Sequence, residues 1–430
     1  MKKSRSTKKP DVSASLLESE KVDSNPTLVP KLRFPEFRGS DEWTAKKVAN
    51  LVQLVSGIHL SPEQYGEVGS VPYFTGPSDF TNNTEDITKR TSDSTSLAKQ
   101  NDTLITVKGS GVGEIWYLTL PFVAIGRQLM ALRATDASCR FIYQFLLTKR
   151  QRFEDLATGN LIPGLSRGDI LELESHFPSL PEQQQIADCL SSLDELIGEQ
   201  DRKVDALRTH KKGLMQQLFP REGETQPRLR FPEFQDAGDW EETNLAQLGE
   251  LVSGLTYSPD DIRDSGLLVL RSSNVQDGEI SLYDNVYVDP AIRGANLSQP
   301  NDILICVRNG SKALIGKCAL IPEGMPLCTH GAFMTVFRSQ ASRFVFQLFQ
   351  TDRYQKQVAG DLGATINSIN GRQLLKYKFI VPTLPEQQRI ASCLGNLDAL
   401  ITAETQKHEA LKTHKRGLMQ QMFPSPEEAS

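Results

Sequence analysis

The chain has 430 residues, 38% of them hydrophobic and 23% charged, a globular composition with room for two or more cores. Its formal net charge of -5 excludes a generally basic surface, so contacts to nucleic-acid phosphates would need a local arrangement of Lys and Arg, or a partner. No stretch of about 18 consecutive apolar residues occurs, which excludes a membrane-spanning helix and predicts no membrane partner.

The six cysteines show no spacing that indicates a metal site or a disulfide framework. No C-x-x-C pair occurs, and no His lies at zinc-ligand spacing from a Cys. We therefore predict reduced cysteines in a cytoplasmic protein, with no bound metal. The positions are Cys139, Cys189, Cys306, Cys318, Cys328 and Cys393.

Residues 1–30 are polar, begin with several basic residues and lack the apolar stretch of a signal peptide. They are predicted to form a disordered tail. Residues 31–179 are predicted to form the first folded domain, with strands and one amphipathic helix near 141–157. Its landmarks are KLRFPEF (31–37), Trp43, LVSG (54–57), and β-rich runs at 71–76, 101–113 and 114–120.

Residues 180–220 have the apolar period of one long helix that packs against another helix. The apolar residues are separated by alternating steps of four and three residues, which is the heptad period of a coiled coil. Gln200 and Lys211 occupy two positions of the same series. Ser179 and Glu182 form a capping-box pattern at the start. A helix of about 37 residues buries only a stripe, so it needs a partner. The apolar residues are Ile186, Leu190, Leu193, Ile197, Val204, Leu207, Leu214 and Leu218.

The remainder of the chain repeats this plan. Residues 384–424 are identical to 180–220 at 26 of 41 positions, and RLRFPEF, Trp240 and LVSG (251–254) repeat the opening of the first domain. Residues 221–383 are predicted to form a second domain, with β-rich runs at 267–275, 301–311 and 316–321 and a helix near 344–359. Residues 425–430 are a short tail. The centres of the two domains differ in sequence, which is typical of one framework with altered loops.

The nearest available partner for each long helix is its own duplicate. The second helix keeps Ile390, Leu394, Leu397, Ile401, Leu411, Leu418 and Met422, and has Glu404, His408 and Lys415 at other seam positions. We predict an α+β fold in which two α/β domains are separated by an antiparallel coiled coil of these helices, with pseudo-two-fold symmetry. The alternative is two surface helices, each on its own domain.

The loops of the two centres carry residue types that read base edges, namely Arg and Lys for guanine, and Asn and Gln for adenine. Solvated turns are the alternative for each position. The first centre has 13 Lys plus Arg against 14 Asp plus Glu over residues 44–178, so a positive face needs local arrangement. The candidates are Lys108, Ser110, Arg127, Gln128 and Asn160 in the first centre, and Arg271, Ser273, Asn274, Arg308, Asn309 and Lys312 in the second.

Two glycine-rich segments do not fit nucleotide-binding motifs. GSGVG (109–113) is followed by a β-type run where a phosphate site needs a helix, and GSKALIGKC (310–318) has Cys where a P-loop has Ser or Thr. Both are predicted to be hairpin turns. We find no duplicated Ser, His and Asp arrangement and no nuclease set, so we predict no catalytic residue in this chain.

The ends of the two long helices share GLMQQ. A Gly inside a helix costs about 1 kcal/mol relative to Ala. Close approach by another chain would explain a retained Gly, and so would simple helix crossing. The candidate partner-binding residues are Gly213, Gln216 and Gln217, with Gly417, Gln420 and Gln421 in the repeat.

These features resemble the DNA-specificity subunit of type I restriction-modification systems, over nearly the whole chain from about residue 31. The most specific elements are the P-x-L-P-E-Q-Q-x-I-A segments (178–187 and 382–391) and the strand-turns NDTLITVKGS and NDILICVRNGS. The basic N-terminal extension departs from the family pattern.

The resemblance implies two target recognition domains that each read one half of a bipartite, asymmetric site in double-stranded DNA. It also implies two modification (methyltransferase) subunits and restriction (motor-nuclease) subunits as partners. S-adenosylmethionine, ATP and Mg are expected on those partners, and no cofactor on this chain. Two alternatives remain: a coiled-coil scaffold that pairs two copies of a protein partner without binding DNA, and a nucleotide hydrolase.

Overall fold

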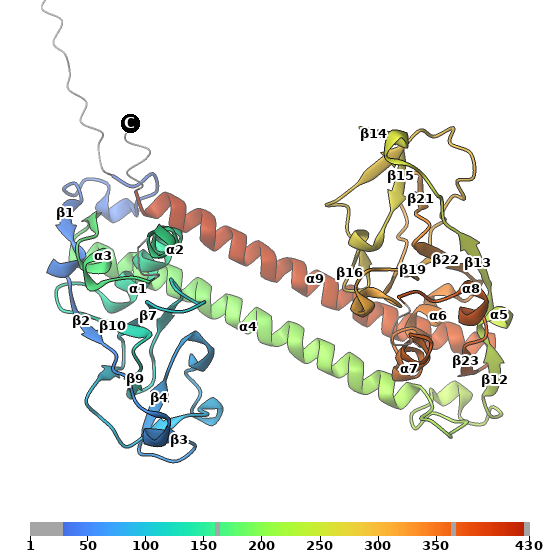
Figure 1. The fold of residues 1–430 in the computed structure, drawn as a ribbon, viewed down its shortest axis with the longest axis horizontal. Helices are drawn as coiled ribbons and strands as arrows, with labels where there is room; N and C mark the ends of the chain where they lie inside the picture. Colours follow the sequence, from blue (N-terminus) through green and yellow to red (C-terminus); the bar gives the residue numbers. More distant parts are fainter. Residues whose placement is uncertain (1–28, 160–163, 363–366, 425–430) are drawn as a thin grey trace, which may run out of the picture. The chain divides into compact units, whose positions relative to one another are not determined.

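The computed structural model describes residues 29–159, 164–362 and 367–424. The chain forms two compact units, one of Met1–Gly198 with Ala410–Ser430 and one of Glu199–Glu409. Each unit mixes strands with short helices and includes part of each long helix (Figure 1). Among the described residues, we find no helix with both the length and the apolarity needed to cross a bilayer.

The first unit contains two larger sheets and one strand pair. β2 (Val52–Ser56), β10 (Leu129–Ala134), β7 (Thr103–Thr106) and β8 (Ile115–Tyr117) form one sheet, in that order. The second sheet has the order β3 (Tyr65–Gly66), β5 (Arg90–Thr91), β4 (Val71–Phe74), β9 (Phe122–Ile125) and β6 (Leu97–Lys99). β4 and β9 are parallel, while the other neighbouring strands of these two sheets are antiparallel. β1 (Thr44–Lys47) pairs with β11 (Glu174–Phe177).

The second unit has an equivalent topology. β13 (Glu250–Ser253), β22 (Met334–Arg338), β19 (Ile303–Cys306) and β20 (Cys318–Leu320) form the first sheet. β14 (Ile262–Arg263), β18 (Val286–Val288), β15 (Leu267–Leu270) and β21 (Cys328–His330) form the second, with β15 parallel to β21. β12 (Glu241–Asn244) pairs with β23 (Lys378–Val381). A further hairpin joins β16 (Val275–Gln276) and β17 (Glu279–Ile280).

The short helices correct one prediction. Where we expected a single amphipathic helix in each domain, the described chain has a pair of helices in its place: α1 (Cys139–Thr148) with α2 (Arg150–Gly159), and α6 (Ser342–Leu348) with α7 (Asp352–Asp361). The hydroxyl of Thr148 donates to the Phe145 carbonyl, and that of Thr351 to the Leu348 carbonyl. Such local bonds compete with the helical ladder, so apolar period alone does not reveal the break. The remaining short helices are α3 (Arg167–Leu171), α5 (Leu245–Leu248) and α8 (Gly371–Leu374).

The two predicted long helices are present as α4 (Leu180–Leu218) and α9 (Leu384–Met422), and they run antiparallel in each unit (Figure 1). In the first unit the start of α4 joins one apolar core with Met422, at the end of α9. In the second unit Leu218, at the end of α4, shares a core with Ile390, near the start of α9. The paired-helix prediction is therefore confirmed within each unit.

Polar side chains fix the register of this pairing. Lys415 Nζ lies 2.6 Å from Asp194 Oδ1 in the first unit, and Lys211 Nζ lies 2.5 Å from Asp398 Oδ1 in the second. Glu404, which interrupts the apolar seam, accepts hydrogen bonds from Lys203 and Gln200, and these bonds, the one from Lys203 most of all, lower the pKa of Glu404. The polar seam residues therefore pair with each other across the helices.

The capping-box prediction at the helix start is replaced by a buried ion pair. Both carboxylate oxygens of Glu182 accept from the Arg33 guanidinium at 2.7 Å, and Trp43 Nε1 donates to the same group at 3.2 Å. In the second unit Arg230 binds Glu386 at 2.8 and 2.7 Å. The opening motif of each domain is thus held against the first turn of a long helix.

Candidate functional site

Three turns meet at one end of the first unit, following β4, β7 and β9. Gly126 N–H donates to the Phe74 carbonyl at 2.8 Å, and Val107 N–H donates to the Gln128 carbonyl at 2.7 Å. Leu165 N–H donates to the Val107 carbonyl at 2.8 Å. These backbone bonds bring turns 75–79, 107–113 and 126–128 into one surface.

The second unit repeats the same three bonds. Gly331 N–H donates to the Leu270 carbonyl at 3.0 Å, Val307 N–H to the Phe333 carbonyl at 3.1 Å, and Ile369 N–H to the Val307 carbonyl at 2.8 Å. The turns after β15, β19 and β21 therefore occupy the places of those after β4, β7 and β9. One backbone framework presents two different sets of side chains.

In the first unit the framework brings together four of the five predicted residues. Lys108, Ser110 and Arg127 are exposed, and Gln128 is half-buried. A Cβ built on Gly76 would lie 2.8 Å from Gln128 Oε1, so the Gln128 side chain reaches across to the turn that follows β4. Asn160 lies outside the described residues. The predicted hairpin turn at 109–113 is confirmed, since β7 and β8 pair antiparallel on either side of it.

In the second unit Arg308 and Lys312 are exposed, and Asn309 is half-buried. Asn309 Nδ2 donates to Ser272 Oγ at 3.0 Å, which ties the turn after β19 to the turn after β15. Burial raises the pKa of Cys306, whose thiol donates to the Arg308 carbonyl at 3.6 Å. The predicted hairpin at 310–318 is also present, between antiparallel β19 and β20.

The turn after β15 does not present all its predicted residues. Ser273 is exposed, but Asn274 is fully buried. The Asn274 amide donates to the carbonyls of Ser281 and Asp284 and accepts from Arg271 N–H, so it shapes the loop and is not available to a base edge. Arg271 pairs with Asp284 at 2.7 Å.

Phe333 is a candidate that residue-type reasoning missed. It is 59% exposed and follows β21, at the place that Gln128 holds in the first unit. The sequence criterion was a charged or amide side chain in a loop, so an aromatic residue did not qualify. Aligning AIGRQLM (124–130) with THGAFMT (329–335) places Phe333 against Gln128, and that alignment was available from the sequence.

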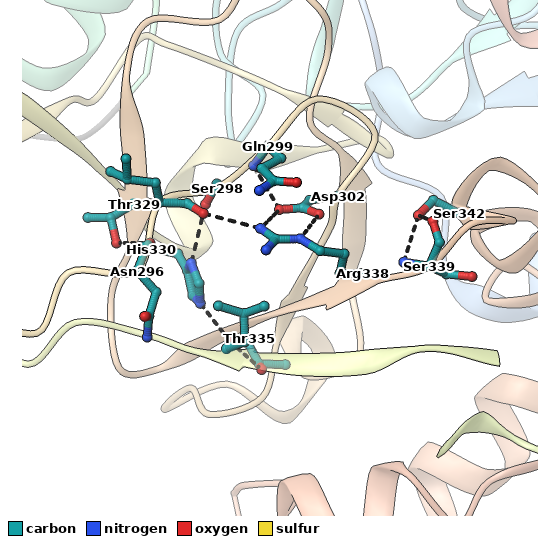
Figure 2. Close-up of polar contacts among 12 residues, drawn as sticks. Asn296, Ser298, Gln299, Asp302, Thr329, His330, Thr335, Arg338, Ser339 and Ser342 are labelled. Carbon is teal, nitrogen blue, oxygen red and sulfur yellow. Dashed lines mark hydrogen bonds and ion pairs between the residues drawn. The ribbon is translucent and has the colours of Figure 1, made fainter. Parts of the chain in front are cut away.

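A buried polar network adjoins the turn that carries Phe333 (Figure 2). His330 Nε2 lies 2.9 Å from the Val252 carbonyl, which can only accept, so this nitrogen carries the proton. Nδ1 then accepts from Ser298 Oγ at 3.3 Å. Burial lowers the pKa of His330. The neighbouring Asp302–Arg338 pair, at 2.7 Å, repeats Asp102–Arg133 of the first unit, at 2.8 Å.

The predicted partner-binding residues lie at the ends of α4 and α9. Gln216, Gln217, Gln420 and Gln421 are exposed, and Gly213 and Gly417 are half-buried. A Cβ on either glycine would meet no atom within 4 Å among the described parts of the chain. Helix crossing within this chain therefore does not explain these glycines.

The two units therefore belong to a class of protein in which each unit packs against paired long helices and presents its own set of exposed turns. A family model described as the type I restriction modification DNA specificity domain matches residues 40–206 and 237–413. The chain belongs to this family. The two matched ranges correspond to the duplicated halves.

Individual relatives agree. The chain is 25% identical over 342 residues to the type I restriction enzyme MjaVIII specificity subunit of Methanocaldococcus jannaschii, covering 75% of this chain and 78% of that protein. It is 27% identical over 182 residues to the EcoKI specificity subunit of Escherichia coli K12, covering 40% and 39%. The fold is similar to the crystal structure of the S subunit from M. genitalium, with a TM-score of 0.64, 19% identity, and coverage of 92% and 99%.

Proposed function

We propose that this chain is the non-catalytic DNA specificity subunit of a type I restriction-modification complex, in which each three-turn surface reads one half of a bipartite, asymmetric target. The observation that carries the proposal is the repeated backbone framework. The same three backbone bonds hold Lys108, Arg127 and Gln128 in one unit, and Arg308, Asn309 and Phe333 in the other. Unlike side chains on like frameworks read unlike base sequences.

The proposed partners are two modification subunits and the restriction subunits of the complex. The repeated GLMQQ segments of α4 and α9, with their exposed glutamines, support two equivalent docking places. The modification subunits would bring S-adenosylmethionine and adenine methylation, and the restriction subunits would bring ATP, Mg and cleavage. This chain contributes target choice and assembly, and binds none of these cofactors.

Local charge supports double-stranded DNA as the ligand despite the net charge of -5. Lys108 and Arg127 are exposed on one turn surface, and Arg308 and Lys312 on the other. Each cation that neutralises a phosphate steepens the salt dependence of binding. The remaining phosphate contacts would come from the modification subunits, so we expect weak DNA binding by the chain alone.

Methylome sequencing of cells that carry this chain with its modification subunits tests the proposal. We expect one gapped, asymmetric motif with two unlike halves. A continuous or palindromic motif would contradict two unlike readers. Arg127→Ala should alter base preferences in one half and Lys312→Ala in the other.

The competing scaffold function predicts a different result. A scaffold would co-purify with two copies of its partner, yet the assembled complex would not distinguish a cognate duplex from a scrambled one. Gel-shift titration of the purified complex with both duplexes separates the two functions. Equal affinity for both duplexes would favour the scaffold.

A further inference from the structure

Phe333 is a large apolar side chain placed where the fold gains little from it. An apolar side chain stabilises the fold in proportion to the surface that it buries, and Phe333 remains 59% exposed. The equivalent position of the first unit holds Gln128, a hydrogen-bonding residue. The two surfaces therefore differ in chemistry at this shared backbone position, where an amide in one unit stands against an aromatic ring in the other.

The backbone holds Phe333 firmly. Its carbonyl accepts from both Val307 N–H and Arg308 N–H, each at 3.1 Å. The preceding Gly331 is fixed by its N–H bond to the Leu270 carbonyl, and His330 is buried. The exposed ring is therefore carried by a rigid turn, and little ordering entropy remains to be lost when a ligand contacts it.

The ring has a cationic neighbour. The Arg308 guanidinium lies 5.6 Å from the centroid of the Phe333 ring, within cation–π distance. Arginine is the commonest reader of guanine in the major groove, and phenylalanine contacts the thymine methyl group. An adjacent Arg–Phe pair suits a guanine and a nearby thymine.

We propose that Phe333 is a specificity-determining residue of the second unit, which contacts the 5-methyl group of a thymine in its half-site, beside a base contacted by Arg308. This assignment rests on the proposed function and extends it to a named base group. Gln128, at the same position in the first unit, has no apolar ring, so the first half-site lacks this methyl contact.

The experiment removes the methyl group and the ring separately. The purified complex with its modification subunits is titrated with cognate duplexes in which each thymine of both half-sites is replaced in turn by deoxyuridine. With the wild-type chain, one replacement should weaken binding about fourfold, the equivalent of one buried methyl-sized group. With Phe333→Ala, the same replacement should have no further effect.

Leu327→Ala is the matched control. Leu327 is 60% exposed and lies directly before β21, whereas Phe333 follows that strand. Its substitution removes a similar exposed apolar side chain from the opposite end of the strand. It should change neither the affinity for the cognate duplex nor the response to deoxyuridine.

Several results would overturn the assignment. If Phe333→Ala weakens binding while no deoxyuridine replacement does so in the wild type, the ring acts as a wedge between bases. If the wild-type complex binds the cognate duplex specifically and Phe333→Ala leaves this binding unchanged, Phe333 does not determine specificity. The proposed function would then still stand. Absence of any specific binding by the wild-type complex would overturn the proposed function and this assignment together.

Discussion

Arg33 and Arg230 explain, at the scale of single residues, why two short repeated motifs recur together. Each arginine belongs to a copy of LRFPEF, and each partner, Glu182 or Glu386, belongs to a copy of LPEQQ. The arginine side chains are 6% and 8% exposed, and both carboxylates are 1% exposed. A charge buried to this extent needs its partner, so the two motifs depend on each other.

We predict that Arg33→Ala destabilises the first unit and Arg230→Ala the second, each by about 3–5 kcal/mol, because a buried carboxylate loses its partner. Pulse proteolysis in urea, with fragments of each unit followed separately, measures the change. Lys356→Ala is the control, since its pair with Glu222 is exposed and should leave the urea midpoint of the second unit unchanged. Equal effects of the buried and exposed variants would contradict the argument.

His330 gives the second unit a pH dependence with a defined sign. Burial lowers the pKa of His330 in the folded chain, so the unfolded chain binds a proton more readily. Its contribution to stability is complete above the ordinary histidine pKa of about 6.5 and is lost as the pH falls toward the lowered value. The charges of Asp302 and Arg338, which face the ring, act on the pKa of His330 in opposite directions, so burial decides the sign of the shift.

We predict that the urea midpoint of the second unit decreases as the pH is lowered from 7.5 to 5.5. His330→Gln should reduce this decrease. Glutamine is neutral at both values and can still donate to the Val252 carbonyl. The same pulse-proteolysis assay measures both proteins, and the first unit, with Ile125 at the equivalent position, serves as an internal reference. Parallel pH curves for wild type and variant would exclude His330 as the source.

Residue type alone predicted only part of the candidate site. Lys108, Arg127, Arg308 and Lys312 are exposed on the turns, as a base-reading role requires. Asn274 has the same residue type as Asn309 but is buried, because its amide satisfies carbonyls of its own loop. That difference depends on contacts with residues 281–284, which no local sequence pattern encodes.

At the scale of elements, period and repetition predicted the long helices well. The heptad steps and the duplicated sequence both indicated α4 and α9 and their antiparallel pairing. The same reasoning did not find the breaks at Lys149 and at residues 349–351, beside which the Thr148 and Thr351 hydroxyls compete with the helical ladder. Long periodic signals sum over many residues, whereas a break depends on one side-chain bond.

The helix glycines allow a prediction that separates stability from assembly. Gly213→Ala should stabilise the second unit by about 1 kcal/mol, because alanine favours the helix and its Cβ meets no atom within 4 Å. If the glycine is retained for close approach by a modification subunit, the variant should also bind that subunit more weakly. Urea unfolding of the chain and co-purification with the tagged subunit measure the two effects.

Gly395→Ala is the matched control for this prediction. Gly395 lies inside α9, and a Cβ added there would also meet no atom within 4 Å, but the residue is outside the GLMQQ segments. The substitution should raise stability by a similar amount and leave co-purification unchanged. Equal loss of partner binding in both variants would mean that helix stiffness, and not the surface at Gly213, governs assembly.

At the scale of the whole molecule, each unit draws its core from both duplicated halves of the sequence. The core of the first unit includes Phe423 of the C-terminal region, whose ring lies 5.4 Å from that of Phe141 and 6.5 Å from that of Trp43. The core of the second unit includes Phe219, 6.3 Å from Trp240 and 5.9 Å from Phe344. Each duplicated half of the sequence therefore completes part of the other half's core.

This exchange predicts a crossed pattern of destabilisation. Phe423→Ala should cost the first unit about 3–5 kcal/mol, although the substituted residue follows the second unit in sequence. Phe219→Ala should cost the second unit a similar amount, although it follows the first. Hydrogen exchange followed by mass spectrometry measures the protection of backbone amides in β10 for the first unit and in β22 for the second. If each variant instead loosened the unit that precedes it in the sequence, each long helix would belong to its own half, and the shared-core architecture would be wrong.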